Sequence, residues 1–440
     1  MEIMDFFITS SRGDSIPLSY EMCTTYIGLR IAALMNNQII GFPRLVRLNP
    51  NIPYKTRGNG AVCIDTGKGT GKGMVIGSFG GNEIISYDKG IESPLEDVMK
   101  GSIISIVNQF YVHNNPDTNP GIVFMENKPD LDFYKRCLRE DVPVDSARRV
   151  INGSKGERVE INNGRGIIGA TASIAWRPGF HTFELICYQG ENKVKLSHEQ
   201  KISIARLCDS WKGTFNNMDE ENQTPSIFPR ERTPVFFGIR ATDPFVLLKL
   251  FDEVKMKFPE IPEDFLIYET NQGTDDHIRF SNGAVIEGMG VRVTGRIKGK
   301  SERSQGGHLK GSILSGNDQI NFIVFEPSKK FRNTFENLRD GDKVSLFGSV
   351  SRGAVKIEKL EIISTSNYYR RIVPVCHMCG IKGKNRGSGN YECPSCGISI
   401  LPDYSFIPRN VNEGKFQPPV SARRHLSMPW EIEDQIDEVK

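Results

Sequence analysis

The sequence predicts a multidomain protein of the α+β class. The chain has 440 residues, more than one hydrophobic core usually supports, and helical and strand-like patterns are mixed along it. Five strand patterns follow one another between residues 283 and 368, and four closely spaced cysteines come after them. Together these observations predict four domains, at residues 1–200, 201–282, 283–368 and 369–440.

The first domain is expected to open with an apolar helix over Tyr26–Met35, and the preceding Thr24 and Thr25 are suited to cap it. Near the end of the domain, a short strand over Arg158–Ile161 is predicted to turn into a helix of small residues over Gly169–Trp176. This mixture of helices and strands is the basis for the α+β class.

Two loops of this domain combine basic or amide side chains with glycine. Pro43–Ala61 carries four basic residues and two glycines around an asparagine, and glycine lets successive backbone N–H groups face an anion. Asn163–Gly166 precedes a helix whose first N–H groups and positive dipole end suit a phosphate. We expect a phosphate site here, although a solvated basic loop has the same composition. The candidate residues are Lys55, Arg57, Gly58, Asn59, Gly60, Asn163, Gly164 and Gly166.

Two further glycine-rich stretches are weaker signals. Gly67–Gly73 (GKGTGKG) resembles a P-loop, but Lys72 stands where the second glycine is required, so a flexible basic loop is predicted. Gly164–Gly169 matches G-x-G-x-x-G, yet Glu184, the acid that should end a strand, falls inside one. Neither stretch is therefore taken as a nucleotide fingerprint on its own.

The second domain shows a β-α-β pattern, with strands over Pro234–Ile239 and Asp264–Tyr268 and a helix over Pro244–Phe258. This order predicts a ferredoxin-like domain. The polar loop that follows, Thr270–Ile278, contains Asp275, Asp276 and His277, which either bind a metal or serve as turn and capping residues.

The third domain is predicted to be an OB-fold barrel. Its five strands show period-2 patterning, and a short helix over Phe331–Leu338 falls between the third and fourth, which is the OB order. The long polar hairpin Lys298–Gly307 is of the kind that such barrels use to hold nucleic acid. The predicted strands are Val285–Lys298, Gly307–Leu314, Gln319–Phe325, Lys343–Val350 and Ala354–Ile363.

The fourth domain is predicted to be a zinc ribbon. Cys376, Cys379, Cys393 and Cys396 form the pattern C-x2-C-x13-C-x2-C, in which each half directs two thiolates at one point. Two disulfides or a redox pair are the alternatives. The remaining five cysteines are scattered singly among apolar residues, as reduced structural thiols usually are.

Charge is distributed unevenly along the chain. The formal net charge is +3, but residues 283–430 hold 23 Lys and Arg against 12 Asp and Glu. A basic C-terminal third predicts a nucleic-acid-binding part joined to another unit, with Lys298, Lys300, Arg303, Lys310, Arg370 and Arg371 as candidate contacts. No serine triad, pair of glycosidase carboxylates or catalytic Cys–His pair stands out. No apolar run approaches the ~20 residues of a membrane span, so a cytoplasmic protein is expected.

The order of these segments resembles the archaeal isoleucine-tRNA 2-agmatinylcytidine synthetase family over essentially the whole chain. The resemblance is carried by the barrel, the four cysteines and the segments Met22–Gly28 (MCTTYIG), Pro43–Ala61, Asn119–Val123, Asn163–Ala170, Thr233–Ala241, Thr270–Ile278 and Pro418–Pro429 (PPVSARRHLSMP). Members of this family use ATP and agmatine to convert the wobble cytidine of the isoleucine tRNA with a CAU anticodon into agmatidine.

The resemblance implies a ligase whose N-terminal domain is kinase-like. In the family, the γ-phosphate of ATP activates the C2 oxygen of cytosine and agmatine displaces it. Thr24 matches the threonine that the family phosphorylates on itself, Asp14 matches a carboxylate that would hold Mg²⁺, and Arg57 would stabilise the transition state. The OB fold and zinc ribbon would bind the tRNA.

One motif departs from the family. Members open with a strand ending in G-I-D-D-T-D-S, whereas this chain has Phe7–Ser15 (FITSSRGDS), which places Ser11, Arg12 and Asp14 on the three aspartates. A Mg²⁺ site that loses two carboxylates should lose affinity. Substitute carboxylates are Asp5, Glu21, Asp65, Asp117, Asp275 and Asp276. Two functions follow, the active synthetase and a relative that binds tRNA or single-stranded nucleic acid without completing the reaction.

Overall fold

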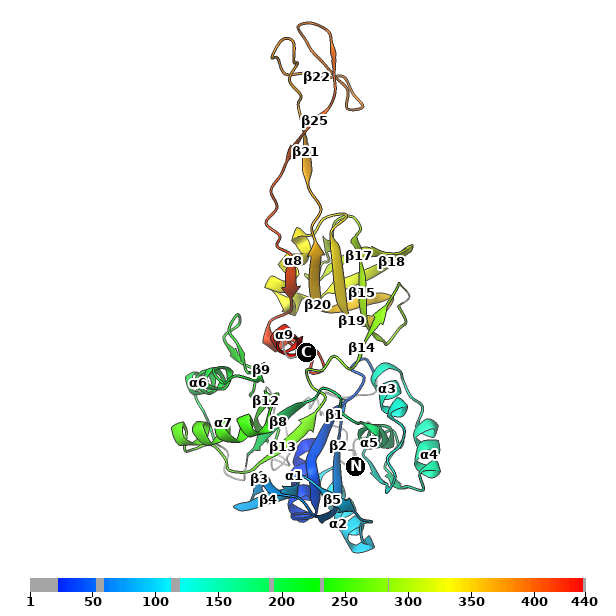
Figure 1. Ribbon diagram of the computed structural model, residues 1–440, viewed down its shortest axis with the longest axis vertical. Helices are drawn as coiled ribbons and strands as arrows, with labels where there is room; N and C mark the ends of the chain where they lie inside the picture. Colours follow the sequence, from blue (N-terminus) through cyan, green and yellow to red (C-terminus); the bar gives the residue numbers. More distant parts are fainter. Residues whose placement is uncertain are drawn as a thin grey trace, which may run out of the picture.

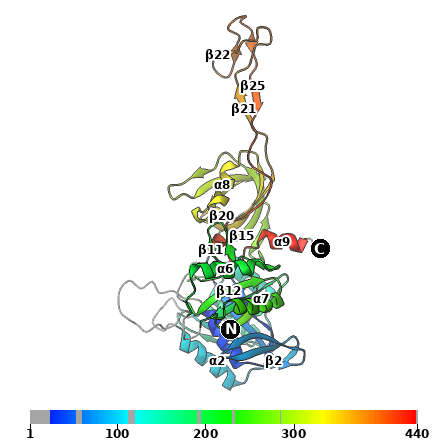
Figure 2. The same ribbon diagram turned by 90° about the vertical axis from the view of Figure 1, so that its left-hand side faces the viewer.

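The computed structural model describes residues 23–52, 59–111, 119–189, 194–229, 233–283 and 285–437. Three bodies follow one another along the long axis of the molecule (Figures 1 and 2). A large body with a mixed sheet and flanking helices lies at one end, a barrel lies in the middle, and a small cysteine-rich unit projects at the other end on a narrow two-stranded stalk. The architecture is therefore mixed α and β, as the sequence predicts.

The large body is built on a nine-stranded sheet with the strand order β5-β2-β1-β4-β3-β13-β8-β12-β9. β1 also pairs with β13 in parallel, so the sheet divides around β3 and β4. The strands are β1 (Ile39–Arg47), β2 (Gly60–Gly69), β3 (Gly73–Phe79), β4 (Asn82–Tyr87), β5 (Gly90–Glu92), β8 (Thr182–Tyr188), β9 (Thr214–Phe215), β12 (Val235–Ala241) and β13 (Phe265–Thr270). β6 (Gly121–Phe124) and β7 (Glu157–Glu160) form a separate two-stranded antiparallel sheet, with two helices between them in the chain.

Helices cover both faces of the sheet because its central strands are apolar on both sides. In β13, Leu266 and Tyr268 pack with helices α1 and α2, whereas Phe265 and Ile267 pack with α6 and α7 on the opposite face. Helices α3, α4 and α5 cover β1 and β2 on that second face. The helices are α1 (Thr24–Leu34), α2 (Asp97–Phe110), α3 (Leu131–Arg139), α4 (Val144–Gly153), α5 (Gly166–Ala175), α6 (His198–Asp209) and α7 (Pro244–Lys257).

Two expectations differ from the observed sheet. The stretch Gly67–Gly73 is not a flexible loop, because its first three residues end β2 and pair with β5. Strand β8 lies before the expected domain boundary at residue 200, yet it sits between β12 and β13 in the same sheet. Local sequence patterns do not show which strands pair over long sequence separations, and for this reason the sequence analysis places a domain boundary at residue 200.

The middle body is a closed barrel of five strands. β15 pairs with β17 and β19, β20 lies between β19 and β18, and β18 returns to β17, so the ring has no open edge among these strands. Helix α8 (Lys330–Asn337) follows the third strand, as expected. The strands are β15 (Gly290–Ile297), β17 (Leu309–Ser315), β18 (Asp318–Val324), β19 (Lys343–Ser351) and β20 (Ala354–Ser364), with β14 (Ile278–Ser281) and β16 (Glu302–Arg303) at the rim.

The stalk consists of β21 (Tyr369–Ile372) and β25 (Asp403–Phe406), paired antiparallel (Figure 1). At its tip, β22 (Lys384–Asn385), β23 (Tyr391–Glu392) and β24 (Ser399–Ile400) form a three-stranded sheet. The chain then returns along the barrel as β26 (Gly414–Phe416), passes through the turn η2 (Val420–Ala422) and ends in α9 (Trp430–Asp437).

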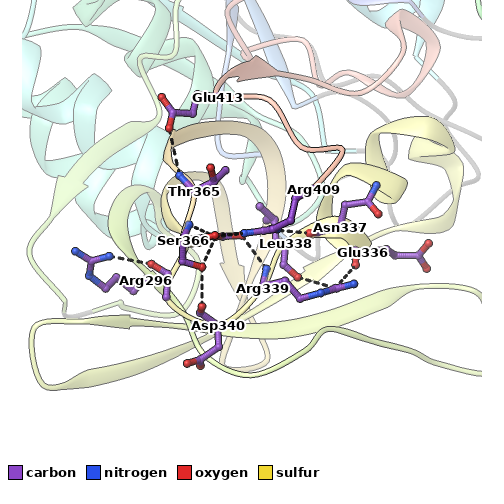
Figure 3. A network of polar contacts seen from close by, with 12 residues as sticks. Arg296, Glu336, Asn337, Leu338, Arg339, Asp340, Thr365, Ser366, Arg409 and Glu413 are labelled. Atoms are coloured by element: carbon purple, nitrogen blue, oxygen red, sulfur yellow. Dashed lines mark hydrogen bonds and ion pairs between the residues drawn. The ribbon is translucent and has the colours of Figure 1, made fainter. Parts of the chain in front are cut away.

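Asp342 anchors the base of the stalk to the barrel through Ser366 and Arg409, two residues that Figure 3 shows side by side in one polar network. Its buried carboxylate accepts hydrogen bonds from Nη1 and Nη2 of Arg409, at 2.7 and 2.6 Å, and from the backbone nitrogen of Ser366 at 2.7 Å. Ser366 lies just before the outgoing strand of the stalk and Arg409 just after the returning one. Burial by itself raises the pKa of Asp342, but the bonds from Arg409 and Ser366 outweigh it and lower that pKa.

Replacing Asp342 by Asn should loosen the stalk base. We expect a loss of about 3 kcal/mol in the free energy of unfolding, because Arg409 would lose the carboxylate that balances its charge in a buried site. Because the folded pKa of Asp342 is depressed, this contribution should be complete above about pH 4 and disappear as the pH falls further. Chemical denaturation measures the change in the free energy of unfolding. Glu413→Gln, which changes an exposed acceptor beside the same site, is the control.

Candidate functional site: a glycine-lined cleft and a four-cysteine centre

The turn that starts α5 is packed tightly against the chain before β6. A Cβ on Gly166 would lie 2.3 Å from the carbonyl oxygen of Asn119 and 2.3 Å from the backbone nitrogen of Gly121. Asn119 Oδ1 accepts a hydrogen bond from the backbone nitrogen of Asn163 at 3.0 Å, and Gly164 has a φ of +73°. Glycine is therefore required for this turn and this approach. α5 begins three residues earlier than predicted, directly at the turn.

Asn59 and Gly60 lie beside the same turn. Gly60 is the first residue of β2 and pairs with Arg47, and Asn59 donates from Nδ2 to the carbonyl oxygen of Asn49 at 3.3 Å. Asn59 and Arg165 line one small cavity of ≈ 20 Å³ together with Ile168 and Gly169 of α5. The structure thus brings together the described parts of the two glycine loops, from residues about one hundred positions apart in the sequence.

A separate, larger cavity of ≈ 220 Å³ lies between β2 and β6. Its walls come from β2, β6, α1, α2 and the end of α5, and they are apolar at the centre with charged groups around them. The lining includes Ile31, Met35, Ile64, Asp65, Glu92, Lys100, Ile103, Val123, Phe124, Met125, Glu126, Lys128, Glu157 and Ile174. β6 connects the two parts, since Gly121 packs on the glycine turn and Phe124 lines the larger cavity.

An ion-pair cluster borders this cavity. Arg44 is buried and donates to Asp65 Oδ1 at 2.6 Å and to the carbonyl oxygen of Trp176 at 2.9 Å, while Lys128 contacts Asp65 Oδ2 at 2.7 Å. Burial lowers the pKa of Arg44, but Cys63 and Asp65 raise it more, so the guanidinium stays charged. Asp65 is therefore balanced by two cations rather than free to hold Mg²⁺. The sequence placed Arg44 in a basic loop and gave no signal for this pairing across β1 and β2.

Thr24 is the first residue of α1 and is buried. The capping role considered for Thr24 and Thr25 is wrong, because Cys23 occupies the cap position and makes no side-chain capping bond. Tyr268 donates its hydroxyl hydrogen to the carbonyl oxygen of Thr25 at 2.6 Å. Tyr268 lies near the C-terminal end of β13, which pairs with the C-terminal part of β1. Gly60, the first residue of β2, pairs with Arg47 at the same end of β1. The N-terminal ends of α1 and α5 therefore lie at one edge of the sheet, on opposite faces.

Several predicted site residues fall outside the described part of the chain. They are Asp14, Lys55, Arg57 and Gly58, together with Asp5, Ser11, Arg12, Glu21 and Asp117. The Mg²⁺ site expected from them stays a prediction. Among the described residues, the four cysteines form the one group of three or more His, Cys, Asp and Glu side chains that could hold a metal.

The metal-binding reading of Asp275, Asp276 and His277 is wrong. Asp275 pairs with Lys359 of the barrel, Asp276 accepts a hydrogen bond from Tyr134 at 2.7 Å, and Nε2 of His277 lies 2.9 Å from Glu358. Each side chain is directed at a different partner, so their ligand atoms do not converge. The loop joins the large body to the barrel instead.

Cys376, Cys379, Cys393 and Cys396 converge as the spacing predicts. Their sulfur atoms all lie within 4.8 Å of one another, Cys376 and Cys396 are 3.7 Å apart, and none is in a disulfide. Sulfurs around a tetrahedral zinc are about 3.8 Å apart, so the donor set fits that ion. The backbone N–H of Cys396 lowers the pKa of Cys393, which favours a thiolate there. The pKa of Cys396 is raised: the backbone N–H of Ile398 lowers it, but the bonds to the other three sulfurs raise it more, so without a metal the cluster keeps a shared proton that a bound ion would displace.

The chain thus combines a mixed α/β body that carries a glycine-rich turn, a small barrel and a four-cysteine centre in one multidomain protein. Residues 13–163 match the family model described as the TiaS TCKD domain, and residues 164–277 match the TiaS FLD domain. The chain belongs to the TiaS family of 2-agmatinylcytidine synthetases for isoleucine tRNA, because a relative of that name from Thermoplasma volcanium is 37% identical over 94% of both chains.

Other comparisons agree with this assignment. The synthetase of the same name from Methanocaldococcus jannaschii is 33% identical, over 94% of this chain and 96% of the relative. A crystal structure of TiaS in complex with its isoleucine tRNA and ATP superposes with a TM-score of 0.76 at 28% identity, covering 94% of each chain. The complex of TiaS with that tRNA, AMPCPP and agmatine gives a TM-score of 0.72 at 25% identity, covering 93% of each. Of the helices that the structure describes, none is long and apolar enough to cross a membrane.

The four-cysteine centre yields a direct prediction. Cys393→Ser should abolish stoichiometric zinc and unfold the tip locally, because three thiolates bind zinc less tightly and the tip has almost no apolar core of its own. Metal analysis of the purified protein measures the first effect, and hydrogen exchange over residues 375–402 measures the second.

His377→Ser, which changes a residue between two of the cysteines, is the control and should keep its zinc. Full zinc occupancy in the Cys393 variant would contradict the assignment of this residue as a ligand.

Proposed function

We propose that this chain converts the wobble cytidine of the isoleucine tRNA with a CAU anticodon into 2-agmatinylcytidine, using ATP and agmatine. The observation that carries the proposal is the match to synthetases of that name over 94% of the chain. The geometry supports it, since Asn59 lines the same small cavity as Arg165, which follows Asn163 and Gly164 in the turn that starts α5.

In this proposal, ATP lies along the cleft between β2 and β6. Its phosphates would lie at the first turn of α5, beside Asn59, Gly60, Asn163 and Gly164, where the positive end of the helix dipole favours an anion. Its base would enter the ≈ 220 Å³ cavity, whose apolar walls include Ile64 and Phe124. The four residues of β6 span roughly the length between the two ends of a nucleotide.

Thr24 is proposed to receive phosphate during the reaction. The N-terminal ends of α1 and α5 lie at the same edge of the sheet, on its two faces, and the γ-phosphate would reach Thr24 across that edge. Asp14 would hold Mg²⁺, which would balance the charge of the transferred phosphoryl group, and Arg57 would add a further positive charge.

The remaining bodies are proposed to hold the tRNA. We assign an OB fold to the five-stranded barrel, since its third and fifth strands are parallel neighbours, and a structural zinc ribbon to the tip of the stalk. Lys300, Arg303 and Lys310 line an open groove of ≈ 420 Å³ on the barrel. A ferredoxin-like unit would begin at β8, because β8, β9, β12 and β13 have the order β13-β8-β12-β9. A cytoplasmic location agrees with a tRNA substrate.

A second candidate function is tRNA binding without catalysis. The motif Phe7–Ser15 favours it, because Ser11 and Arg12 replace two of the three family aspartates. Incubating the purified protein with the tRNA, ATP, Mg²⁺ and agmatine, followed by mass analysis of the anticodon fragment, separates the two. A mass increase on the wobble cytidine that requires both ATP and agmatine supports the synthetase. Unchanged tRNA that still binds the protein supports the alternative.

Thr24→Ala tests the phosphorylation step. We expect it to lose the label that γ-labelled ATP transfers to the parent protein and to form less agmatidine, while binding tRNA with unchanged affinity. Thr24→Ser keeps a hydroxyl group and is the matched control, which should retain most of the label. Equal labelling of parent and Thr24→Ala would exclude Thr24 as the acceptor.

Gly166→Ala tests the placement of ATP. The added methyl group meets backbone on two sides, so the turn must open and we expect the ATP dissociation constant to rise at least about tenfold. Gly153→Ala, on α4 with no atom within 4 Å of the new carbon, should bind ATP like the parent and be slightly more stable. A folded Gly166 variant with parental ATP affinity would place the nucleotide elsewhere.

A further inference from the structure

A second pocket, of ≈ 220 Å³, lies where the large body meets the C-terminal segment after β26. One wall is the loop and hairpin around β10 (Met218–Asp219) and β11 (Thr224–Pro225), and the other is the segment Val420–His425. Figure 2 shows β11 directly below the barrel. The pocket is lined by Arg240, Arg423 and Arg424, and no Asp or Glu is among the described residues that line it.

Each of these three arginines is paired with a carboxylate outside the pocket lining. Nη2 of Arg240 lies 2.9 Å from the buried Glu184, Nη1 of Arg423 lies 3.2 Å from Glu431, and Nε of Arg424 lies 3.4 Å from the buried Glu358. Arg423 also donates to the carbonyl oxygen of Pro418 and, at 2.8 Å, to Asn216. The acids and carbonyls orient the guanidinium groups before any ligand arrives, which reduces the entropic cost of binding.

Each guanidinium group also has nitrogens that these contacts do not use. In the described residues, no partner is found for Nη1 of Arg240 or for Nη2 of Arg423 and Arg424, and Nε of Arg240 is buried without one. Burial lowers the pKa of Arg423, which indicates that its charge is incompletely compensated. Three preoriented guanidinium groups with free N–H donors suit the oxygens of a phosphate.

Two exposed lysines lie between this pocket and the groove on the barrel. The exposed Lys329 donates to Asn222 of the β10–β11 hairpin, and Lys330, also exposed, begins α8. At the other end of α8, Glu336 pairs with Arg303, which lines the barrel groove. Glu221 accepts a hydrogen bond from the backbone nitrogen of Lys330, so this surface carries both signs of charge. Lys329 and Lys330 are its cations for a polyanion that extends from the groove to the pocket, whereas a small anion would not span them.

We propose that the pocket of Arg240, Arg423 and Arg424 binds a backbone phosphate of the RNA where that RNA passes from the barrel to the large body. The inference rests on the proposed function, because it takes the bound polyanion to be the tRNA. It assigns a positioning role to the segment Val420–His425, since phosphate contacts set the register of an RNA on a protein.

The test adds a negative charge to the pocket without removing an arginine. Ser226 lines the pocket and makes only one long side-chain hydrogen bond, so Ser226→Asp should fold and repel a phosphate. Ser203→Asp, on the exposed face of α6 and not in the pocket lining, is the matched control. Arg423→Gln removes one donor group directly. Filter binding with radiolabelled tRNA is measured for each variant over a series of salt concentrations, alongside ATP binding.

We expect Ser226→Asp and Arg423→Gln each to weaken tRNA binding about tenfold, and Arg423→Gln to reduce the salt slope by about one. Ser203→Asp should match the parent, and ATP binding should be unchanged in all three. Parental tRNA affinity in Ser226→Asp would overturn the inference while leaving the proposed function intact. A parent protein that does not bind tRNA would refute the proposed function itself.

Inorganic phosphate distinguishes the other source of this ligand. If titrating phosphate raised the melting temperature of the parent but not of Ser226→Asp, and both bound tRNA equally, the pocket would hold a free anion and the RNA inference would be wrong. Phosphate that fails to stabilise either protein, together with weakened tRNA binding by Ser226→Asp, supports the RNA backbone as the ligand.

Discussion

The arrangement of the molecule depends on the buried polar loop that joins β13 to β14. Asn271 in this loop is completely buried, and its amide bonds both the backbone nitrogen and the carbonyl oxygen of Arg47, at 2.7 and 2.8 Å. It thereby satisfies the backbone at the end of β1, where β1 leaves the sheet. Two residues later Gly273 donates to the carbonyl oxygen of His425, and two residues after that Asp275 pairs with Lys359 of the barrel, so one short stretch connects the sheet with both.

The contacts of this loop with the barrel are ionic and buried. Nε2 of His277 faces Glu358, which Arg424 also approaches, and Asp275 pairs with Lys359, whose amino group lies 4.2 Å from the ring centre of Trp430 in α9. Burial alone would raise the pKa of Glu358, but His277 and Arg424 lower it to about 2. Buried charges of this kind cost solvation energy and are tolerated only when each has its partner, so they restrict the barrel to one orientation on the sheet.

The candidate cleft depends on a different constraint: where α5 meets β6, two glycines without side chains are required. α5 is built from small and apolar residues and is buried along its whole length, so it can lie against β2 and β6 at once. Gly121 and Gly166 let two backbone segments meet without a side chain between them. This close contact fixes the turn that starts α5 next to Asn59, with which Arg165 lines a small cavity.

The sequence by itself determined the local elements and the chemistry of single segments. The five barrel strands, the helix between them, the helix Pro244–Lys257 and the four converging cysteines all follow from periodicity and spacing, because these depend on residues close together in the chain. Only the tertiary structure decided that Asp275, Asp276 and His277 join domains, that Asp65 is neutralised by Arg44 and Lys128, and that β8 belongs between β12 and β13. The physical reason is the same in each case: the partner of a buried charge or an unpaired strand lies far away in the sequence, and folding alone brings the two together.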